Sequence, residues 1–158
     1  MDDTDTSSSH ELAGEGVMGS VRPGRAHLRD IEFGWPLLEQ IVELGIRQAM
    51  AVRERDVIAV EVTEGIESMI GRAAKLCRRR GWVLLKGAPS GADGDASCVT
   101  VGTIERLAAA GARCLAVDAA RVRFAGRKAV LDAADRARIA VVGVAPRYRN
   151  GPDPAERR

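Results

Sequence analysis

Charged residues at the ends of two apolar segments are the groups in this sequence best suited to chemistry. Glu61 lies near the end of the apolar run 57–62, and Glu64 comes shortly after it. Lys86 ends the apolar run 82–86. In an open α/β sheet, ligands bind at the carboxyl ends of the strands. Carboxylates bind Mg²⁺, and a lysine brings a positive point charge to a phosphate. The two segments therefore predict a site for a phosphate and its metal.

The segment that follows Lys86 is rich in Gly, Ala, Asp and Ser. Residues 87–101 are predicted to form a loop that contains Gly91, Asp93 and Asp95. Such Gly and Asp loops are more often plain turns. A Mg²⁺ ion held by one or two carboxylates and by substrate phosphates would use such a pair, so both interpretations stay open.

The other charged residues also have interpretations that involve no chemistry. Glu64 and Glu67 lie in the first turn of a helix predicted over 64–80, where carboxylates compensate the helix dipole. Lys86 can be an edge lysine whose ammonium group reaches solvent. The arginines 78–80 most simply form the solvated end of the same helix.

Several common catalytic arrangements are absent from the sequence. It contains no Gly-x-x-x-x-Gly-Lys-Ser/Thr loop and no Gly-x-Ser-x-Gly. Its two histidines, His10 and His27, fall outside the predicted folded unit. An enzyme built from this chain must therefore rely on carboxylates, Lys or Arg, with a metal such as Mg²⁺ as the expected cofactor.

The composition narrows the class of protein. Of the 158 residues, 46% are hydrophobic but only 3% are aromatic, so the core must consist of Ala, Val, Ile and Leu, as in proteins with buried parallel strands. The net charge is +2, and aromatic residues for stacking on bases are scarce. Nucleic acid is therefore not an expected partner.

The chain is expected to act in the cytoplasm. No apolar run reaches the roughly 18 residues that a membrane span needs, and the N-terminus is acidic and lacks the hydrophobic run of a signal peptide. The three cysteines, Cys77, Cys98 and Cys114, are widely spaced and have no histidine nearby. They are interpreted as reduced thiols in or near the core.

Apolar periodicity predicts short strands that alternate with helices, which is typical of α/β proteins. Pro36 fits the first turn of the first helix, and Gly81 fits the position after the second. Residues 54–56 separate two strands and predict a hairpin, so the sheet is expected to be mixed, mainly parallel and flanked by helices. The predicted helices cover 35–44, 64–80, 103–110 and 127–137, and the predicted strands cover 49–53, 57–62, 82–86, 114–117, 122–124 and 139–144.

The predicted elements belong to a single domain over residues 30–146. Residues 1–29 are dominated by Ser, Asp, Gly and Thr without apolar periodicity, so they are expected to form a disordered arm. Residues 147–158 are polar and contain two prolines, which predicts a disordered tail.

An ordered set of segments resembles the C-terminal domain of the UDP-2,3-diacylglucosamine diphosphatase family of lipid A synthesis. It opens with Asp30–Trp35, Gln48–Val52 and Ile58–Gly65. Single motifs are weak, but their order over about residues 30–145 is fairly specific. The resemblance continues through Val83–Lys86, Gly91–Asp93, Thr100–Gly102, Leu115–Asp118, Ala133–Asp135 and Val141–Val144.

The resemblance implies a Mg²⁺-dependent hydrolase that splits the pyrophosphate of UDP-2,3-diacylglucosamine into UMP and an acylated glucosamine phosphate. Carried over to this chain, it makes Asp93 and Glu64 catalytic, Lys86, Gly65 and Gly91 substrate-binding, and Glu61 and Asp93 the metal ligands. Family members have two domains with the ligand between them. The expected partners are therefore a sugar nucleotide or nucleotide-linked lipid, a second copy of the chain, or a separate N-terminal domain.

The chain departs from the family pattern in the loop after Lys86. The family has Gln, Arg and a second Asp where this chain has Ala92, Asp95 and Ser97, while Asp93 is kept. The replacement of Arg by Asp reverses a charge at a place where a phosphate favours a cation. Two functions stay open: the hydrolase, and a non-catalytic binding or assembly module that keeps the fold.

Overall fold

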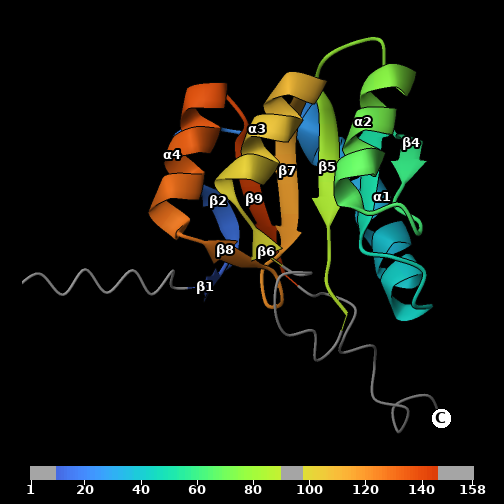
Figure 1. The fold of residues 1–158 in the computed structure, drawn as a ribbon, viewed down its shortest axis with the longest axis horizontal. Helices are drawn as coiled ribbons and strands as arrows, with labels where there is room; N and C mark the ends of the chain where they lie inside the picture. The colour runs from blue at the N-terminus through green and yellow to red at the C-terminus, as the bar shows by residue number, and fades with distance from the viewer. Residues whose placement is uncertain (1–9, 90–97, 146–158) are drawn as a thin grey trace, which may run out of the picture.

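The computed structural model describes residues 10–89 and 98–145, which form a mixed sheet with helices on both faces (Figure 1). The six-stranded sheet has the order β2-β9-β7-β5-β3-β4, and a three-stranded sheet has the order β1-β8-β6. The elements are β1 (His10–Leu12), β2 (Gly16–Met18), α1 (Arg25–Glu43), β3 (Ala49–Arg53), β4 (Asp56–Val60), α2 (Ile66–Leu76), β5 (Trp82–Lys86), β6 (Cys98–Val99), α3 (Val101–Ala110), β7 (Ala112–Asp118), β8 (Arg123–Ala125), α4 (Arg127–Ala137) and β9 (Ala140–Val144).

The prediction of a mixed α/β sheet in a single domain is confirmed. The adjacent strands β5, β7 and β9 are parallel, whereas β3 runs antiparallel to both β4 and β5, and β2 runs antiparallel to β9. The mainly parallel character that the sequence predicts therefore holds for the centre of the six-stranded sheet, and its two sides are antiparallel.

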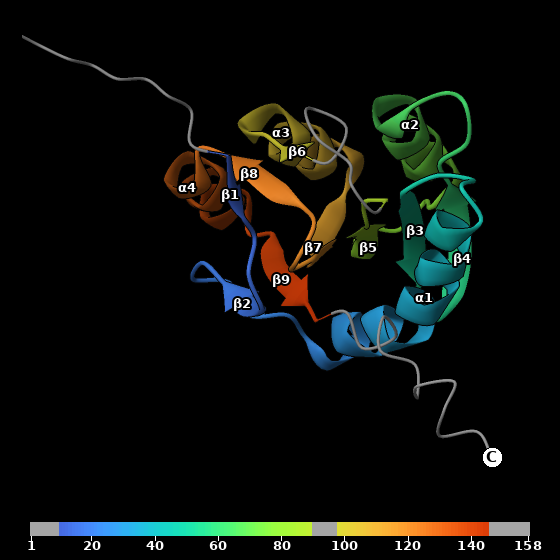
Figure 2. The same cartoon turned by 90° about the horizontal axis from the view of Figure 1, so that it is seen from below.

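The alternation of side chains along β5 divides the core into two layers. Trp82 and Leu84 pack with residues of α2, α3 and α4 on one face, and Val83 and Leu85 pack with α1 on the other. Figure 2 shows the three helices on one side of the sheet and α1 on the opposite side. All five residues of β5 are buried, because both faces of this central strand are covered.

Helix α1 approaches the sheet closely at Gly34. A Cβ atom at this position would lie 2.5 Å from Leu85 Cδ1 and 3.0 Å from Val52 Cγ2. Only glycine therefore allows the helix to pack at this distance. The helix also begins at Arg25, ten residues before the predicted start, so the assignment of Pro36 to a first turn is wrong.

The prediction of a disordered arm over residues 1–29 is wrong for residues 10–29. Strand β1 pairs with β8, and β2 pairs with β9, so this segment completes both sheets. Ser20 adds a further connection, because its N–H and its hydroxyl each donate to the Asp135 carboxylate, at 2.8 and 2.9 Å. Residues 1–9 and the predicted tail over 147–158 lie outside the described residues.

Two predicted element boundaries also need correction. Helix α2 ends at Leu76, because Cys77 adopts an extended conformation, so the arginines 78–80 lie in the exposed connection to β5. Gly81 directly precedes β5 and does not close the helix. In the region predicted as a loop over 87–101, residues 98–99 form β6, and Thr100 caps α3 by accepting from the Thr103 N–H at 3.2 Å.

The three cysteines are free thiols, as predicted. Burial, and secondarily the charge of Asp30, raises the pKa of Cys114 to about 12, so this core thiol stays protonated. Within the described ranges, none of the helices combines the length and the apolar character needed to cross a membrane.

The predicted hairpin of β3 and β4 is confirmed, and α1 supports its turn. Glu54 and Arg55 occupy the left-handed region, with φ values of 52° and 56°. The carboxylate of Asp30, only 3% exposed, accepts hydrogen bonds from their backbone N–H groups at 3.2 and 2.7 Å. Asp30 therefore satisfies two turn donors and joins the helix to the hairpin.

We predict that Asp30→Ala lowers the free energy of unfolding by about 2 kcal/mol, because two N–H groups lose their acceptor. Urea denaturation measures this change. Glu32→Ala, at an exposed position of the same helix, should change it by less than about 0.5 kcal/mol. An equally small effect of Asp30→Ala would contradict the role of this carboxylate.

Candidate functional site

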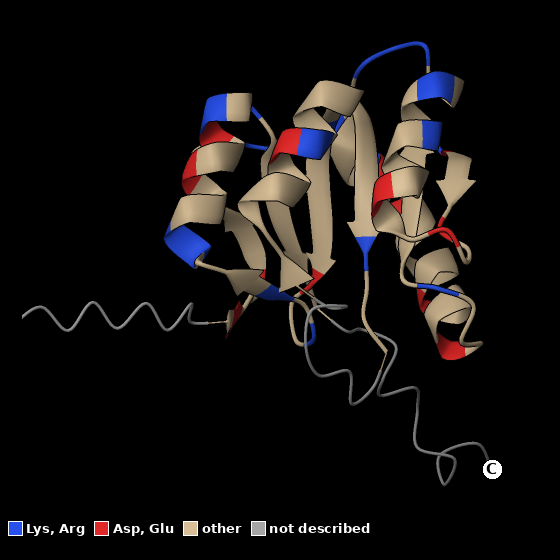
Figure 3. Cartoon of the chain, in the orientation of Figure 1, with Lys and Arg blue, Asp and Glu red and all other residues tan. Residues whose placement is uncertain are grey.

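The three parallel strands β5, β7 and β9 end at the same side of the sheet, which we call the carboxyl edge. Lys86 and Asp118 are the last residues of β5 and β7, and both are buried, with 4% and 7% exposure. In Figure 3 the end of β5 is basic and the end of β7 is acidic, and these two strands are neighbours in the sheet. Polar groups at the carboxyl ends of parallel strands are the usual basis of ligand sites in such sheets.

The side chains of Lys86 and Asp118 nevertheless belong to different faces of the sheet. Lys86 continues the alternation of Trp82 and Leu84, so it belongs to the face covered by α2 and α3. Asp118 continues the alternation of Cys114 and Ala116, so it belongs to the α1 face. The carboxyl edge therefore carries two separate polar environments.

On the face of α2 and α3, Lys86 and Glu61 lie in one row across the sheet, on either side of Ala49, and their predicted site roles stay predictions. Burial lowers the pKa of Lys86, and the negative charges of Glu61 and Cys98 act in the opposite direction and raise it. The backbone adds a direct connection, since the Glu61 N–H donates to the Ala49 carbonyl at 2.9 Å and Ala49 is the β3 partner of Lys86. An ammonium group held next to a carboxylate at a strand end can bind a phosphate.

Glu64, which the resemblance makes catalytic, is paired with a cation. Its carboxylate forms an ion pair with Arg72 of α2, in which Nη2 contacts Oε1 and Nε lies 3.5 Å from Oε2. Glu64 also precedes α2 instead of lying in its first turn, so it does not share a helix face with Glu67. The catalytic role of Glu64 stays a prediction.

Gly65, predicted to bind substrate, has a conformational role. It is the residue before α2 and has a φ of +89°, which side-chain-bearing residues rarely adopt. A Cβ atom there would have no neighbour within 4 Å, so the backbone at this position is open. Gly91 and Asp93, the remaining predicted site residues, lie outside the described residues.

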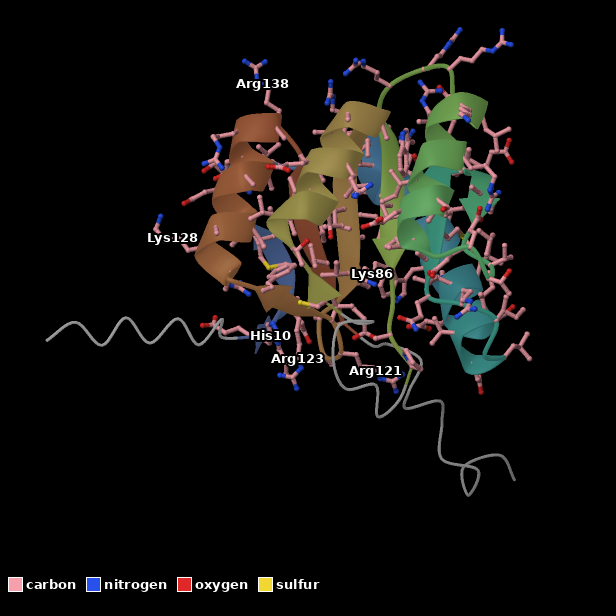
Figure 4. All side chains as sticks on the ribbon, viewed as in Figure 1. His10, Lys86, Arg121, Arg123, Lys128 and Arg138 are labelled. Carbon is pink, nitrogen blue, oxygen red and sulfur yellow. The ribbon has the colours of Figure 1, made fainter. Side chains whose placement is uncertain are left out.

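On the α1 face, a cleft of about 600 Å³ opens beside Asp118. Trp35 and Leu38 of α1 form one wall, and Asp118 and Arg121 lie on the other. Arg121 Nη1 donates to the Ala88 carbonyl at 3.2 Å, which ties the segment after β7 to the segment after β5. Figure 4 shows Lys86 at the end of β5 and Arg121 at the outer rim.

Asp118 and Arg121 were not among the site residues predicted from the sequence. Asp118 follows the apolar run 114–117 as Lys86 follows 82–85, so the same signal was present. Its carboxylate accepts from the Ala120 N–H at 2.9 Å and so stabilises the turn after β7. No sequence signal marks Arg121, because its position depends on the contact with Ala88.

The described residues at the carboxyl edge offer few carboxylates that could hold Mg²⁺. They contain no group of 3 or more His, Cys, Asp or Glu side chains placed to hold a metal ion. Glu61 is the carboxylate beside Lys86, whereas Glu64 is paired with Arg72 and Asp118 lies on the other face. Mg²⁺ often takes only one or two carboxylates and completes its shell with phosphates and water, so Glu61 fits one ligand position.

Comparisons with known proteins add an independent finding. A family model described as the LpxI C-terminal domain matches residues 14–142. The chain is also similar to the UDP-2,3-diacylglucosamine pyrophosphatase LpxI of Caulobacter vibrioides, with 35% identity over 156 residues. This match covers 89% of the chain but only 55% of the relative, so the chain spans about half the length of that protein.

The buried ammonium of Lys86 predicts a pH dependence of stability. Because its pKa is lowered below 10.5 in the folded state, the unfolded state binds more protons between the lowered value and 10.5. Lys86 should therefore make the free energy of unfolding rise with pH through this range, whereas the raised pKa of Cys114 acts in the opposite direction from about pH 9 upward. Lys86→Met should remove that rise in urea denaturation from pH 7 to about pH 10. Lys128→Met, at a side chain 90% exposed, should keep it. A rise that persists in Lys86→Met would show that other groups cause it.

Proposed function

This chain belongs to the LpxI C-terminal domain family, and on that premise we propose that it takes part in hydrolysing the pyrophosphate of UDP-2,3-diacylglucosamine. The family resemblance inferred from the sequence is thereby confirmed. The proposed reaction consumes one water molecule, which adds to one phosphorus while the bond from that phosphorus to the bridging oxygen breaks. The products are UMP and an acylated glucosamine phosphate.

The observation that carries the proposal is the burial of Lys86 at the carboxyl edge, on the same face of the sheet as Glu61. Lys86 is almost completely buried, and a buried ammonium is costly unless a negative charge offsets its loss of hydration. Glu61 supplies part of that charge. We assign to Lys86 the binding of a phosphate oxygen, since an anion at this position would stabilise the charged lysine further.

The proposal gives the carboxylates complementary roles. Glu61 and Asp93 would hold Mg²⁺, which neutralises charge on the phosphates when it is bound. Asp93 would also orient the attacking water through its second oxygen. The support for Asp93 is the family pattern that this residue keeps, and the support for Glu61 is its position beside Lys86.

The substrate class, the partner that covers the ligand and the compartment are proposed from the same family relationship. The proposed ligand is a sugar nucleotide that carries acyl chains. It would be covered either by a second copy of this chain or by a separate chain that corresponds to the unmatched part of the relative. The proposed compartment is the cytoplasm, which suits the three free thiols.

A non-catalytic binding or assembly module remains the second candidate function. It is favoured by Asp95 and Ser97, which stand where the family pattern has Arg and Asp. This alternative predicts that Asp93→Ala leaves the role of the protein in the cell intact, whereas the hydrolase requires Asp93.

The activity can be tested by incubating the purified chain with UDP-2,3-diacylglucosamine and Mg²⁺ or Mn²⁺ and measuring UMP. The reaction should be run with and without the unmatched part of the Caulobacter relative. We expect UMP release, and a loss of about 100-fold in kcat/KM for Lys86→Ala and for Asp93→Asn. Asp132→Asn serves as the matched control, because this carboxylate pairs with Lys128 on the exposed face of α4. Absence of UMP under all these conditions at high protein concentration would refute the hydrolase.

A further inference from the structure

Arg72 of α2 reaches back across the connection between β4 and α2. Its Nη2 donates to the Val60 carbonyl at 2.8 Å and also contacts the Glu64 carboxylate. Val60 ends β4, and Glu64 lies two residues before α2, so one guanidinium group contacts both ends of the connection. We call these contacts the Arg72 bridge. Bonds of this kind, between a planar guanidinium and a carboxylate, are among the stronger ones in proteins.

The Arg72 bridge acts on the peptide group that joins Val60 to Glu61. The carbonyl of this peptide accepts from Arg72, and its N–H donates to the Ala49 carbonyl at 2.9 Å. A peptide group is planar, so contacts on both sides fix its orientation. The Glu61 side chain begins at the next atom of the chain, and its direction depends on this orientation.

The rest of the connection has little other support among the described contacts. Gly65 directly precedes α2 and has no side chain that could cap the helix. Its φ of +89° is one that glycine adopts freely. The first turn of α2 is therefore not anchored by a capping side chain, which increases the importance of Arg72 for this segment.

We infer that Arg72 is a positioning residue that holds Glu61 on the face of the sheet that carries Lys86, and that Glu64 serves as the carboxylate partner of Arg72 instead of as a catalytic group. The part of this inference that concerns catalysis rests on the proposed function. Both carboxylate oxygens of Glu64 face the Arg72 guanidinium, so the side chain is already engaged within the protein.

The first test measures hydrogen exchange and needs no activity. Arg72→Met should accelerate exchange of the Glu61 amide by about tenfold or more, because the peptide loses a charge-assisted hydrogen bond. The amide of Leu84, in the central strand, should keep its rate and so report that the core is intact. Arg106→Met is the matched control, because Arg106 pairs with Glu67 at an exposed site, and it should change neither amide. An unchanged Glu61 rate in Arg72→Met would overturn the Arg72 bridge.

The second test uses activity and separates positioning from catalysis. Arg72→Met should lower kcat about tenfold and raise the Mg²⁺ concentration needed for half-maximal rate, while KM for the substrate changes little. Arg72→Lys should fall between this variant and the unmodified chain, because an ammonium cannot donate along the same two directions. A purely structural role would leave the Mg²⁺ dependence unchanged, and that result would overturn the inference.

Glu64→Gln distinguishes the two roles of Glu64. The amide oxygen of Gln can still accept from Arg72, so activity should stay within about threefold of the unmodified chain. A loss of 100-fold or more would show that Glu64 is catalytic and would overturn its assignment. If the chain releases no UMP at all, the exchange measurement still decides the Arg72 bridge, so failure of the proposed function and failure of this inference give different results.

Discussion

The structure depends on one constraint, the alternation of side chains along the central strands. Because β5 and β7 are covered on both faces, each residue belongs either to the layer of α2, α3 and α4 or to the layer of α1. The polar residues that end these strands follow the same rule. Lys86 therefore meets Glu61 on one face, and Asp118 lines the cleft on the other. A shift of either strand by one residue would exchange these environments.

The two environments suit different parts of a ligand. The face with Lys86 offers a buried cation next to a carboxylate, which suits a phosphate and a divalent metal. The α1 face offers a cleft with a wall of Trp35 and Leu38, which suits a less polar group. An acylated sugar nucleotide contains both kinds of group, so the division at the carboxyl edge agrees with the proposed substrate class.

The sequence predicts best those strands and helices whose own residues show a clear apolar pattern. The apolar run of β5 and the periodic helix α4 have the predicted bounds. The start of α1 was missed because Gly34 and Pro36 interrupt an otherwise helical pattern. Strands β1 and β2 were missed because they have only three residues each and are stabilised by partners distant in sequence. The role of Arg72 could not be predicted because its contact with the Val60 carbonyl forms only in the folded chain.

The N-terminal strands have a consequence for how the chain folds. Residues 10–18 pair with β8 and β9, and the contact of Ser20 with Asp135 spans 115 positions. During synthesis, β1 and β2 leave the ribosome before β8 and β9, so neither sheet is complete until these later strands have formed. Contacts so distant in sequence slow folding, because a long loop has to close before they form. Until then the edge of β9 that β2 covers is exposed, and this is the part of the molecule most open to pairing with another chain.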